Sequence, residues 1–321
     1  MTPLLNIEKL SVSFDSDEGV VKAVRDIDLE IRKGETLALV GESGCGKSVT
    51  ALSILRLLTT PPARYDSGKI VFEGKNLLNL QDAQLQDIRG NRIGMIFQEP
   101  MTSLNPIFTI GEQISESLRR HKKLNSSQAR EETLKLLKQV AIPAPERRID
   151  QYPHELSGGM KQRVGIAMAI SCKPKLIIAD EPTTALDVTI QAQIMELLQS
   201  LKDELGSALL LITHNLGIVA QHADRVEVMY AGKIIERATA LELFENPSHP
   251  YSKGLMNSLP KGNPGESLSP ISGNVPHPAF LPDGCAFHPR CSDAMSHCKN
   301  SAPPSFTLSE KRTSACWLFD S

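Results

Sequence analysis

Glycine, lysine and serine residues between positions 41 and 48 have the spacing of a phosphate-binding loop. The segment reads GESGCGKS, follows an apolar run at 36–40 and precedes residues with helical character. Its glycines permit a tight turn whose backbone N–H groups point at phosphate oxygens, and the next helix offers its positive N-terminal end. Lys47 is expected to reach the β- and γ-phosphates of a nucleotide, and Ser48 to give Mg²⁺ a hydroxyl ligand. The alternative is a glycine turn with an incidental lysine. The residues expected around the nucleotide are Gly41, Ser43, Gly44, Cys45, Gly46, Lys47, Ser48 and Val49.

Polar residues also end three further apolar runs. Asp180 and Glu181 follow residues 176–179, a pattern typical of a buried parallel strand whose carboxyl end faces a ligand. Asp180 is expected to hold Mg²⁺ through water, and Glu181 to polarise a water in line with the γ-phosphate. Gln98 ends a short strand and suits a γ-phosphate sensor, and His214 lies where it could touch the same phosphate. A strand cap or an ordinary structural residue is the alternative interpretation of each.

A second glycine motif, LSGGMKQR at 156–163, leads into a helical segment. Ser157, Gly158 and Gly159 at a helix N-terminus would form an anion site, but no second lysine completes an independent nucleotide pocket. The motif therefore predicts half a site, or alternatively only a glycine turn with a serine N-cap. Asp187 precedes an amphipathic helix whose apolar positions between 190 and 201 share one face.

The elements that must position these residues begin with two alternating strands at 5–14 and 24–31, which predict antiparallel, half-exposed pairing. Phe14 ends the first of them, where its ring could stack on adenine; packing into the sheet is the alternative. Residues 66–74 predict a turn and a strand. Residues 110–140 are helical in period, with a helix start at Asn125 and Gln128, and two prolines close this insertion. Residues 226–236 predict a hairpin.

Composition allows one large domain or two unequal ones. The chain has 321 residues, of which 40% are apolar and 22% charged, and its formal charge of −2 gives no broad electrostatic reason to expect nucleic acid. No apolar run reaches the 18 or so residues that span a bilayer, and the N-terminus lacks the order of a signal peptide. We therefore expect a cytosolic chain that meets a membrane only through partner proteins.

Four of the six cysteines, Cys285, Cys291, Cys298 and Cys316, lie close to the C-terminal end. In a reducing compartment such clustering favours metal over disulfides. Their spacings are wider than the pairs that zinc modules favour, and thiolates without histidine suit an iron–sulfur cube. The surrounding segment is rich in proline and glycine and could hardly bury a core alone, so an inorganic centre would order it. A [4Fe–4S] cluster is the prediction, with zinc and free thiols as alternatives.

In order and spacing, these motifs resemble the nucleotide-binding subunits of ABC transporters, and the LSGGMKQR segment carries most of the resemblance. Residues 101–106 and 249–255 resemble the subgroup that serves dipeptide, oligopeptide and nickel importers, whose C-terminal tails carry such a cluster at the same cysteine spacing. The resemblance covers residues 4 to about 320. It implies an α/β fold of the P-loop NTPase type at 1–255, with an antiparallel β subdomain and a helical subdomain at about 100–170. A small loop-rich module with the four cysteines would follow at 256–321.

The resemblance also implies a mechanism and partners. Two such subunits would pair head to tail, so that each ATP lies between the phosphate loop of one and the Ser157-Gly158-Gly159 of the other. Glu181 would be the general base, Gln98 would couple the γ-phosphate to the membrane subunits and join Ser48 and Asp180 around Mg²⁺, and His214 would stabilise transferred charge. Asp187 would belong to the nucleotide site. Asn215 stands where relatives usually have aspartate, which predicts slower hydrolysis.

The resulting prediction is the ATP-hydrolysing motor subunit of a peptide importer on the cytoplasmic face of the inner membrane. Its expected partners are two transmembrane permeases, a second, paralogous ATPase and, indirectly, an extracytoplasmic peptide-binding protein. A nickel importer of the same subgroup and a non-transport ABC ATPase are the alternatives. Proteins of the last kind usually carry two such domains, whereas this sequence has one phosphate loop and one signature.

Overall fold

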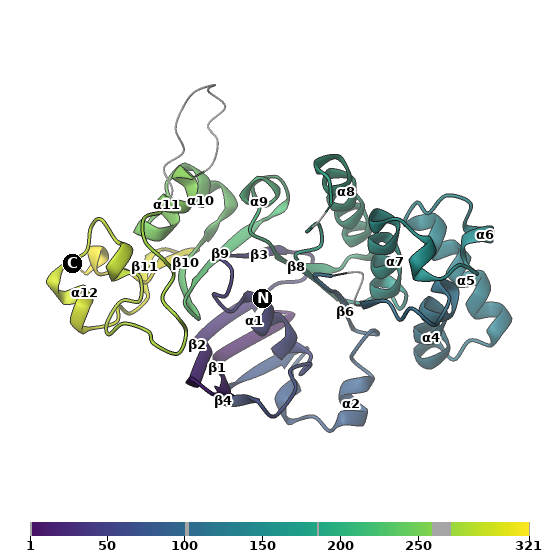
Figure 1. Cartoon of the computed structure of the whole chain (residues 1–321), viewed down its shortest axis with the longest axis horizontal. Coiled ribbons are helices and arrows are strands. Elements are labelled where there is room, and N and C mark those ends of the chain that lie inside the picture. Colours follow the sequence, from purple (N-terminus) through teal and green to yellow (C-terminus); the bar gives the residue numbers. More distant parts are fainter. Residues whose placement is uncertain (1, 100–102, 185, 259–270, 321) are drawn as a thin grey trace. The chain divides into compact units, whose positions relative to one another are not determined.

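The computed structural model describes residues 2–99, 103–184, 186–258 and 271–320. Figure 1 shows the course of the chain, which divides into two compact units. Unit 1 comprises Met1–Glu30, Leu37–Leu78 and Thr213–Ser321, and unit 2 comprises Ile31–Thr36 and Asn79–Ile212. Met101, Thr102 and Ala185, which belong to two of the predicted motifs, lie outside the described residues.

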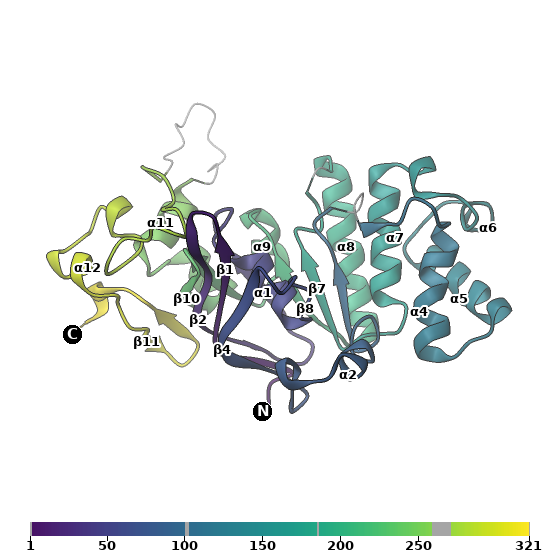
Figure 2. The ribbon, with the colours of Figure 1, turned by 60° about the horizontal axis from the view of Figure 1, so that its bottom comes forward.

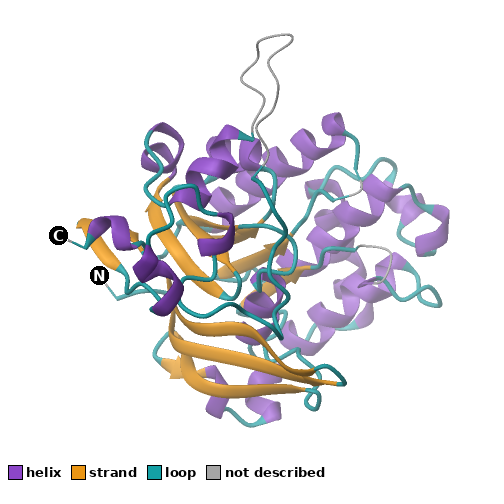
Figure 3. Cartoon of the chain, turned by 60° about the vertical axis from the view of Figure 1, so that its left-hand side comes forward, coloured by secondary structure: helices purple, strands orange, loops and turns teal. Residues whose placement is uncertain are grey.

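An antiparallel sheet forms the first layer of unit 1 (Figure 3). It consists of β1 (Leu5–Ser16), β2 (Gly19–Ile31), β4 (Ala63–Phe72) and β5 (Lys75–Asn76), in the order β2-β1-β4-β5. Alternate residues of β1 are buried, which confirms the predicted half-exposed strands. The turn predicted around Gly68 is wrong, because β4 runs through it. Gly68 has a φ of +94°, and a side chain there would lie 2.5 Å from the carbonyl oxygen of Lys9. The register of the paired strands β1 and β4 shifts at this point, as in a β-bulge.

The second sheet of unit 1 contains β3 (Thr36–Val40), β9 (Arg225–Tyr230), β10 (Lys233–Thr239), β12 (Arg312–Ser314) and β11 (Phe306–Ser309). β3 and β9 are parallel, and β9 and β10 form the predicted hairpin. β12 pairs with β10, so two strands of the C-terminal segment extend the sheet of the preceding domain. The helices of this unit are α1 (Lys47–Ile54), α9 (Leu216–His222), α10 (Ala240–Glu245), α11 (Pro250–Asn257) and α12 (Ser296–Asn300).

Unit 2 is built on three parallel strands, β6 (Ile93–Ile96), β7 (Leu176–Asp180) and β8 (Ala208–Ile212). Every residue of β7 and β8 is buried, as expected for parallel strands that are covered on both faces. The short helix α2 (Asp82–Gln86) precedes β6, and α8 (Val188–Leu205) connects β7 to β8. This arrangement brings the carboxyl ends of the strands to one edge of the sheet, where ligands bind in folds of this class.

The helical part of unit 2 consists of α4 (Ile110–Lys122), α5 (Ser126–Gln139), α6 (Pro145–Arg148) and α7 (Gly158–Ile170), which Figure 2 shows side by side. Asn125 caps α5 and pairs reciprocally with Gln128, which confirms the predicted helix start. A capping box formed by Thr109 and Glu112 starts α4. None of the helices in the described ranges is long and apolar enough to cross a membrane.

Candidate functional site

The phosphate loop lies in unit 1 between β3 and α1, which confirms the predicted order of strand, loop and helix. The helix ends at Ile54, and the chain turns at Arg56, which has a φ of +49°. Gly44 and Gly46 have φ values of +77° and +109°, and a side chain at Gly46 would lie 2.4 Å from the carbonyl oxygen of Ala23. Only glycine fits this backbone.

Lys47 lies inside this loop and is 5% exposed. Its Nζ donates hydrogen bonds to the carbonyl oxygens of Gly41 and Glu42, at 2.8 and 3.0 Å. The ammonium group is therefore held among the loop's backbone groups rather than extended into solvent. Ser43 and Gly44 are exposed, whereas burial raises the pKa of the Cys45 thiol, partly offset by Lys47. Because the thiolate is the reactive form, a buried, protonated Cys45 thiol is unreactive.

Asp180 and Glu181 lie at the carboxyl end of β7, as predicted. Asp180 is 4% exposed. Glu181 has a φ of +46°, unusual for a residue with a side chain, and its amide donates to the carbonyl oxygen of Ile212 at 2.8 Å. A strained backbone of this kind is typical of functional sites.

Gln98 lies beside Glu181, which the sequence alone did not predict. Its Nε2 donates to Glu181 Oε2 at 3.2 Å, and the hydroxyl of Thr184 donates to the same oxygen at 2.8 Å. Two neutral donors thus orient one carboxylate oxygen. An oriented carboxylate at the edge of a parallel sheet can accept a proton from a bound water.

The signature residues lie at the start of α7 in unit 2, beside the start of α8. Ser157 is the N-cap of α7, and its hydroxyl accepts a hydrogen bond from Met160 N at 3.4 Å. A side chain at Gly159 would lie 3.2 Å from Ile190, whose amide donates to Asp187 Oδ1 at 3.0 Å. Ser157 and Gly158 are exposed, so the positive end of this helix is accessible.

Phe14 and His214 belong to unit 1. Phe14 is half-buried and pairs with Ala63 across the antiparallel sheet. His214 is exposed and follows Thr213. Its neighbour Asn215 caps α9, with Oδ1 accepting from the amides of Gly217 and Ile218 at 3.0 and 3.3 Å. The amide thus satisfies the helix end that an aspartate would otherwise cap.

Two residues that the motif analysis did not single out contact the phosphate loop. Arg290 forms an ion pair with Glu42, and the hydroxyl of Tyr251 accepts a hydrogen bond from Glu42 N. Tyr251 lies in a segment that the resemblance had marked, but nothing in its spacing indicated this contact. Both contacts join residues more than 200 positions apart, and hydrophobic periodicity in the sequence carries no information about such pairs.

The four C-terminal cysteines are free thiols in the structure, as are Cys45 and Cys172. The amide of Cys285 donates to the carbonyl oxygen of Cys298 at 2.8 Å. Burial raises the pKa values of Cys285, Cys316 and Cys291, the last to about 11, and the charges of neighbouring thiolates raise them further. Within the described ranges, no group of three or more His, Cys, Asp or Glu side chains is placed to hold a metal ion. The predicted [4Fe–4S] cluster and its zinc alternative therefore receive no support from the side-chain positions.

Comparison with known proteins agrees with this geometry. Residues 24–184 match the ABC transporter family, and residues 235–298 match the oligopeptide/dipeptide transporter C-terminal region. The dipeptide transport ATP-binding protein DppD of Bacillus subtilis is 50% identical, with 100% of this chain and 96% of that protein covered. The oligopeptide transport ATP-binding protein OppD of the same organism is 49% identical, with coverage of 99% and 89%.

A solved structure shows the same fold. The dimeric ATP-binding cassette MJ0796, in a post-hydrolysis state with ADP and Pi bound, aligns with a TM-score of 0.66 and 28% identity over 74% of this chain and 98% of that one. The predicted fold class is thereby confirmed. This chain belongs to the ATP-binding proteins of the ABC transporter family, and it is an ATPase of that family.

Proposed function

We propose that this chain is the motor subunit of a peptide importer and couples ATP hydrolysis to the uptake of dipeptides or oligopeptides. Relatives named for dipeptide and oligopeptide transport match it over nearly their whole length, and its C-terminal region matches a family of the same transporters. The observation that carries the chemical part of the proposal is the placement of the Glu181 carboxylate by Gln98 and Thr184.

Each proposed site residue has a distinct task. The backbone of the phosphate loop and Lys47 hold the phosphates of ATP, with Phe14 against the adenine. Ser157, Gly158, Gly159 and Asp187 contact the nucleotide of the opposing subunit. Glu181 accepts the proton of the attacking water, and Gln98 keeps the carboxylate oriented toward it. His214 donates to the charge that develops on the transferred phosphate.

The donors proposed for Mg²⁺ suit that ion. Asp180 offers a carboxylate, Ser48 a hydroxyl and Gln98 an amide oxygen, and hard oxygen donors are what magnesium prefers. When bound, Mg²⁺ neutralises charge on the phosphates. Asp180 is almost fully buried at a strand end, so its carboxylate keeps one position.

Substitution of Glu181 tests the catalytic assignment. Glu181→Gln should keep ATP affinity while hydrolysis by the assembled transporter falls by about two orders of magnitude or more, the usual effect of removing a general base. Glu196→Gln, an exposed change on α8, is the matched control. Unchanged hydrolysis in the Glu181 variant would exclude it as the base.

The proposed partners are two transmembrane permeases and a paralogous ATPase at the cytoplasmic face of the membrane, with a peptide-binding protein outside. The chain alone should then hydrolyse ATP weakly, and affinity purification from membranes should recover two polytopic subunits. Labelled dipeptide and nickel uptake, compared in cells with and without this chain, separate the peptide importer from the nickel alternative. Recovery with ribosomes, or a homodimer that transports at full rate with the permeases alone, would contradict the assignment.

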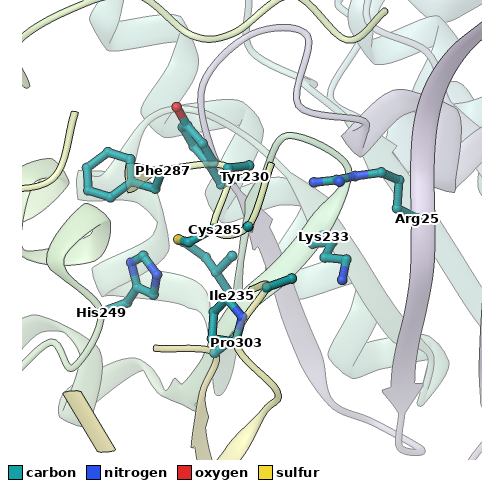
Figure 4. Close-up of a pocket in the computed structure, with 12 residues that line it drawn as sticks. Arg25, Tyr230, Lys233, Ile235, His249, Cys285, Phe287 and Pro303 are labelled. Carbon is teal, nitrogen blue, oxygen red and sulfur yellow. The ribbon is translucent and has the colours of Figure 1, made fainter. Parts of the chain in front are cut away.

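For Cys285, Cys291, Cys298 and Cys316 we propose a [4Fe–4S] cluster with a structural role. The support is the chemistry of four thiols in one short segment. Two cations, Arg25 and Lys233, line the same pocket as Cys285, and their charges favour the thiolate form of that one cysteine (Figure 4). Anaerobic purification should yield brown protein with about four irons per chain. Colourless protein with one zinc and no iron, prepared without oxygen, would overturn the proposal in favour of zinc.

A further inference from the structure

Glu42, the second residue of the phosphate loop, is held from two sides by residues of the C-terminal part of unit 1. Arg290 binds its carboxylate in a bidentate manner, with Nη1 at 2.7 Å from Oε2 and Nη2 at 3.0 Å from Oε1. The hydroxyl of Tyr251 accepts a hydrogen bond from its backbone amide at 2.9 Å. Both the side chain and the main chain of this loop residue are therefore fixed.

Arg290 is itself rigidly placed. Its side chain is 4% exposed, and its Nε donates to the carbonyl oxygen of Ser272 at 3.0 Å. The guanidinium lies 5.9 Å from the ring centres of both Tyr230 and Phe287. The hydrogen bond with the Glu42 carboxylate raises the pKa of Arg290 above its ordinary value. Two parallel hydrogen bonds between planar groups fix the orientation of the Glu42 carboxylate relative to the guanidinium.

The turn that carries Arg290 is anchored in the core of unit 1. It runs from Cys285 to Cys291 and contains a 3₁₀ turn at His288–Arg290. Phe287 in this turn is 3% exposed and packs edge-on against Tyr230 and Tyr251, with ring centres 5.2 and 5.4 Å apart. Figure 4 shows Phe287, Tyr230 and His249 gathered around Cys285. A shift of the turn at 285–291 would therefore also move Tyr251, whose hydroxyl binds the backbone of Glu42.

We propose that Arg290 is a positioning residue for the phosphate loop, through which the C-terminal segment sets the affinity for ATP. The inference rests on the proposed role of residues 41–48 in binding ATP. Glycine-rich loops lose much conformational entropy when they order around a ligand. A loop that is tied at Glu42 beforehand has lost part of that freedom already, so binding costs less.

The position of Glu42 also affects Lys47, the lysine of the loop. The carbonyl oxygen of Glu42 accepts a hydrogen bond from Lys47 Nζ at 3.0 Å. Release of Glu42 therefore changes the position of the ammonium group that is proposed to meet the phosphates. The same geometry explains why an acidic side chain is tolerated next to a site for anions: Arg290 neutralises it.

A double-mutant cycle tests this role. Arg290→Gln should weaken ATP affinity about tenfold, because binding must then order one additional loop segment and an unneutralised carboxylate lies beside the anion site. Glu42→Gln should weaken it by less, and the double variant should match Glu42→Gln, because both of these lose the contact together with the acidic charge. Affinity is measured at equilibrium with EDTA present, and hydrogen exchange of residues 41–48 should be faster in all three variants.

Arg312→Gln is the matched control, because Arg312 lies in the same C-terminal segment as Arg290 but binds Glu236 and the carbonyl oxygen of Asn246 instead of the phosphate loop. It should leave ATP affinity unchanged. If Arg290→Gln does not fold, Glu42→Gln carries the test, since Glu42 is half-buried in the loop. Wild-type affinity in both variants, with Lys47→Ala still abolishing binding, would overturn the inference and leave the proposed function intact. Equal binding by Lys47→Ala and wild type would overturn the proposed function together with the inference.

Discussion

Acidification should destabilise unit 1 through His249. This side chain is 1% exposed, and its Nδ1 accepts a hydrogen bond from the amide of Tyr251 at 3.0 Å, which requires the neutral ring. Burial lowers the pKa of His249 to about 3, and a hydrogen bond with the backbone of Ala315 offsets only part of that effect. The ordinary value is about 6.5.

The sign and the size follow from linkage. Below pH 6.5 the unfolded chain binds a proton at His249 that the folded chain does not bind until about pH 3. The stabilisation is therefore complete above pH 6.5 and is lost progressively as the pH falls toward 3. At pH 5 the loss is about 2 kcal/mol, because each pH unit below the unfolded value contributes about 1.4 kcal/mol.

Urea unfolding at pH 8 and pH 5 measures this loss. Trp317, the single tryptophan of the chain, lies in unit 1, so its fluorescence reports on this unit. His249→Asn keeps a side-chain acceptor at the helix N-cap but does not titrate, and it serves as the control. The wild type should lose about 2 kcal/mol more than this variant between the two pH values. An equal pH dependence of both proteins would refute the reasoning.

Four further substitutions test the fold and the site. Asn215→Asp should keep the cap of α9 and raise stability by about 0.5 kcal/mol through the helix dipole, while steady-state ATP hydrolysis becomes faster; an unchanged rate would show that the amide does not slow turnover. Gly46→Ala should lower the free energy of unfolding by more than about 1 kcal/mol, because the new side chain would clash with the backbone at Ala23. It should also abolish ATP binding in a filter assay. Gly94→Ala should lower the free energy of unfolding by about 1–3 kcal/mol, since a side chain there would lie 2.2 Å from a backbone oxygen of α7. Gly165→Ala on that helix meets open space and should instead stabilise by up to about 1 kcal/mol.

Local sequence determined the elements whose signals lie within a few residues. The glycine spacing at 41–48 fixes a loop between strand and helix, and the apolar runs of β7 and β8 are long enough only for buried strands. Asn125 and Gln128 mark a helix start because the two side chains satisfy each other's backbone amides. The boundaries were less certain where one backbone angle decided them, as at Gly68, where a positive φ lets β4 continue through an expected turn.

Tertiary structure decided the contacts that join distant segments. Gln98 orients Glu181 across 83 positions of sequence, and Arg290 reaches Glu42 across 248. β12 joins the sheet at β10, and Phe287 completes an aromatic cluster in the core. Hydrophobic periodicity and helix caps depend only on residues that are neighbours along the chain. The distant pairs meet because packing of the fold closes long loops. Before folding, each of these residues has many possible partners of suitable chemistry.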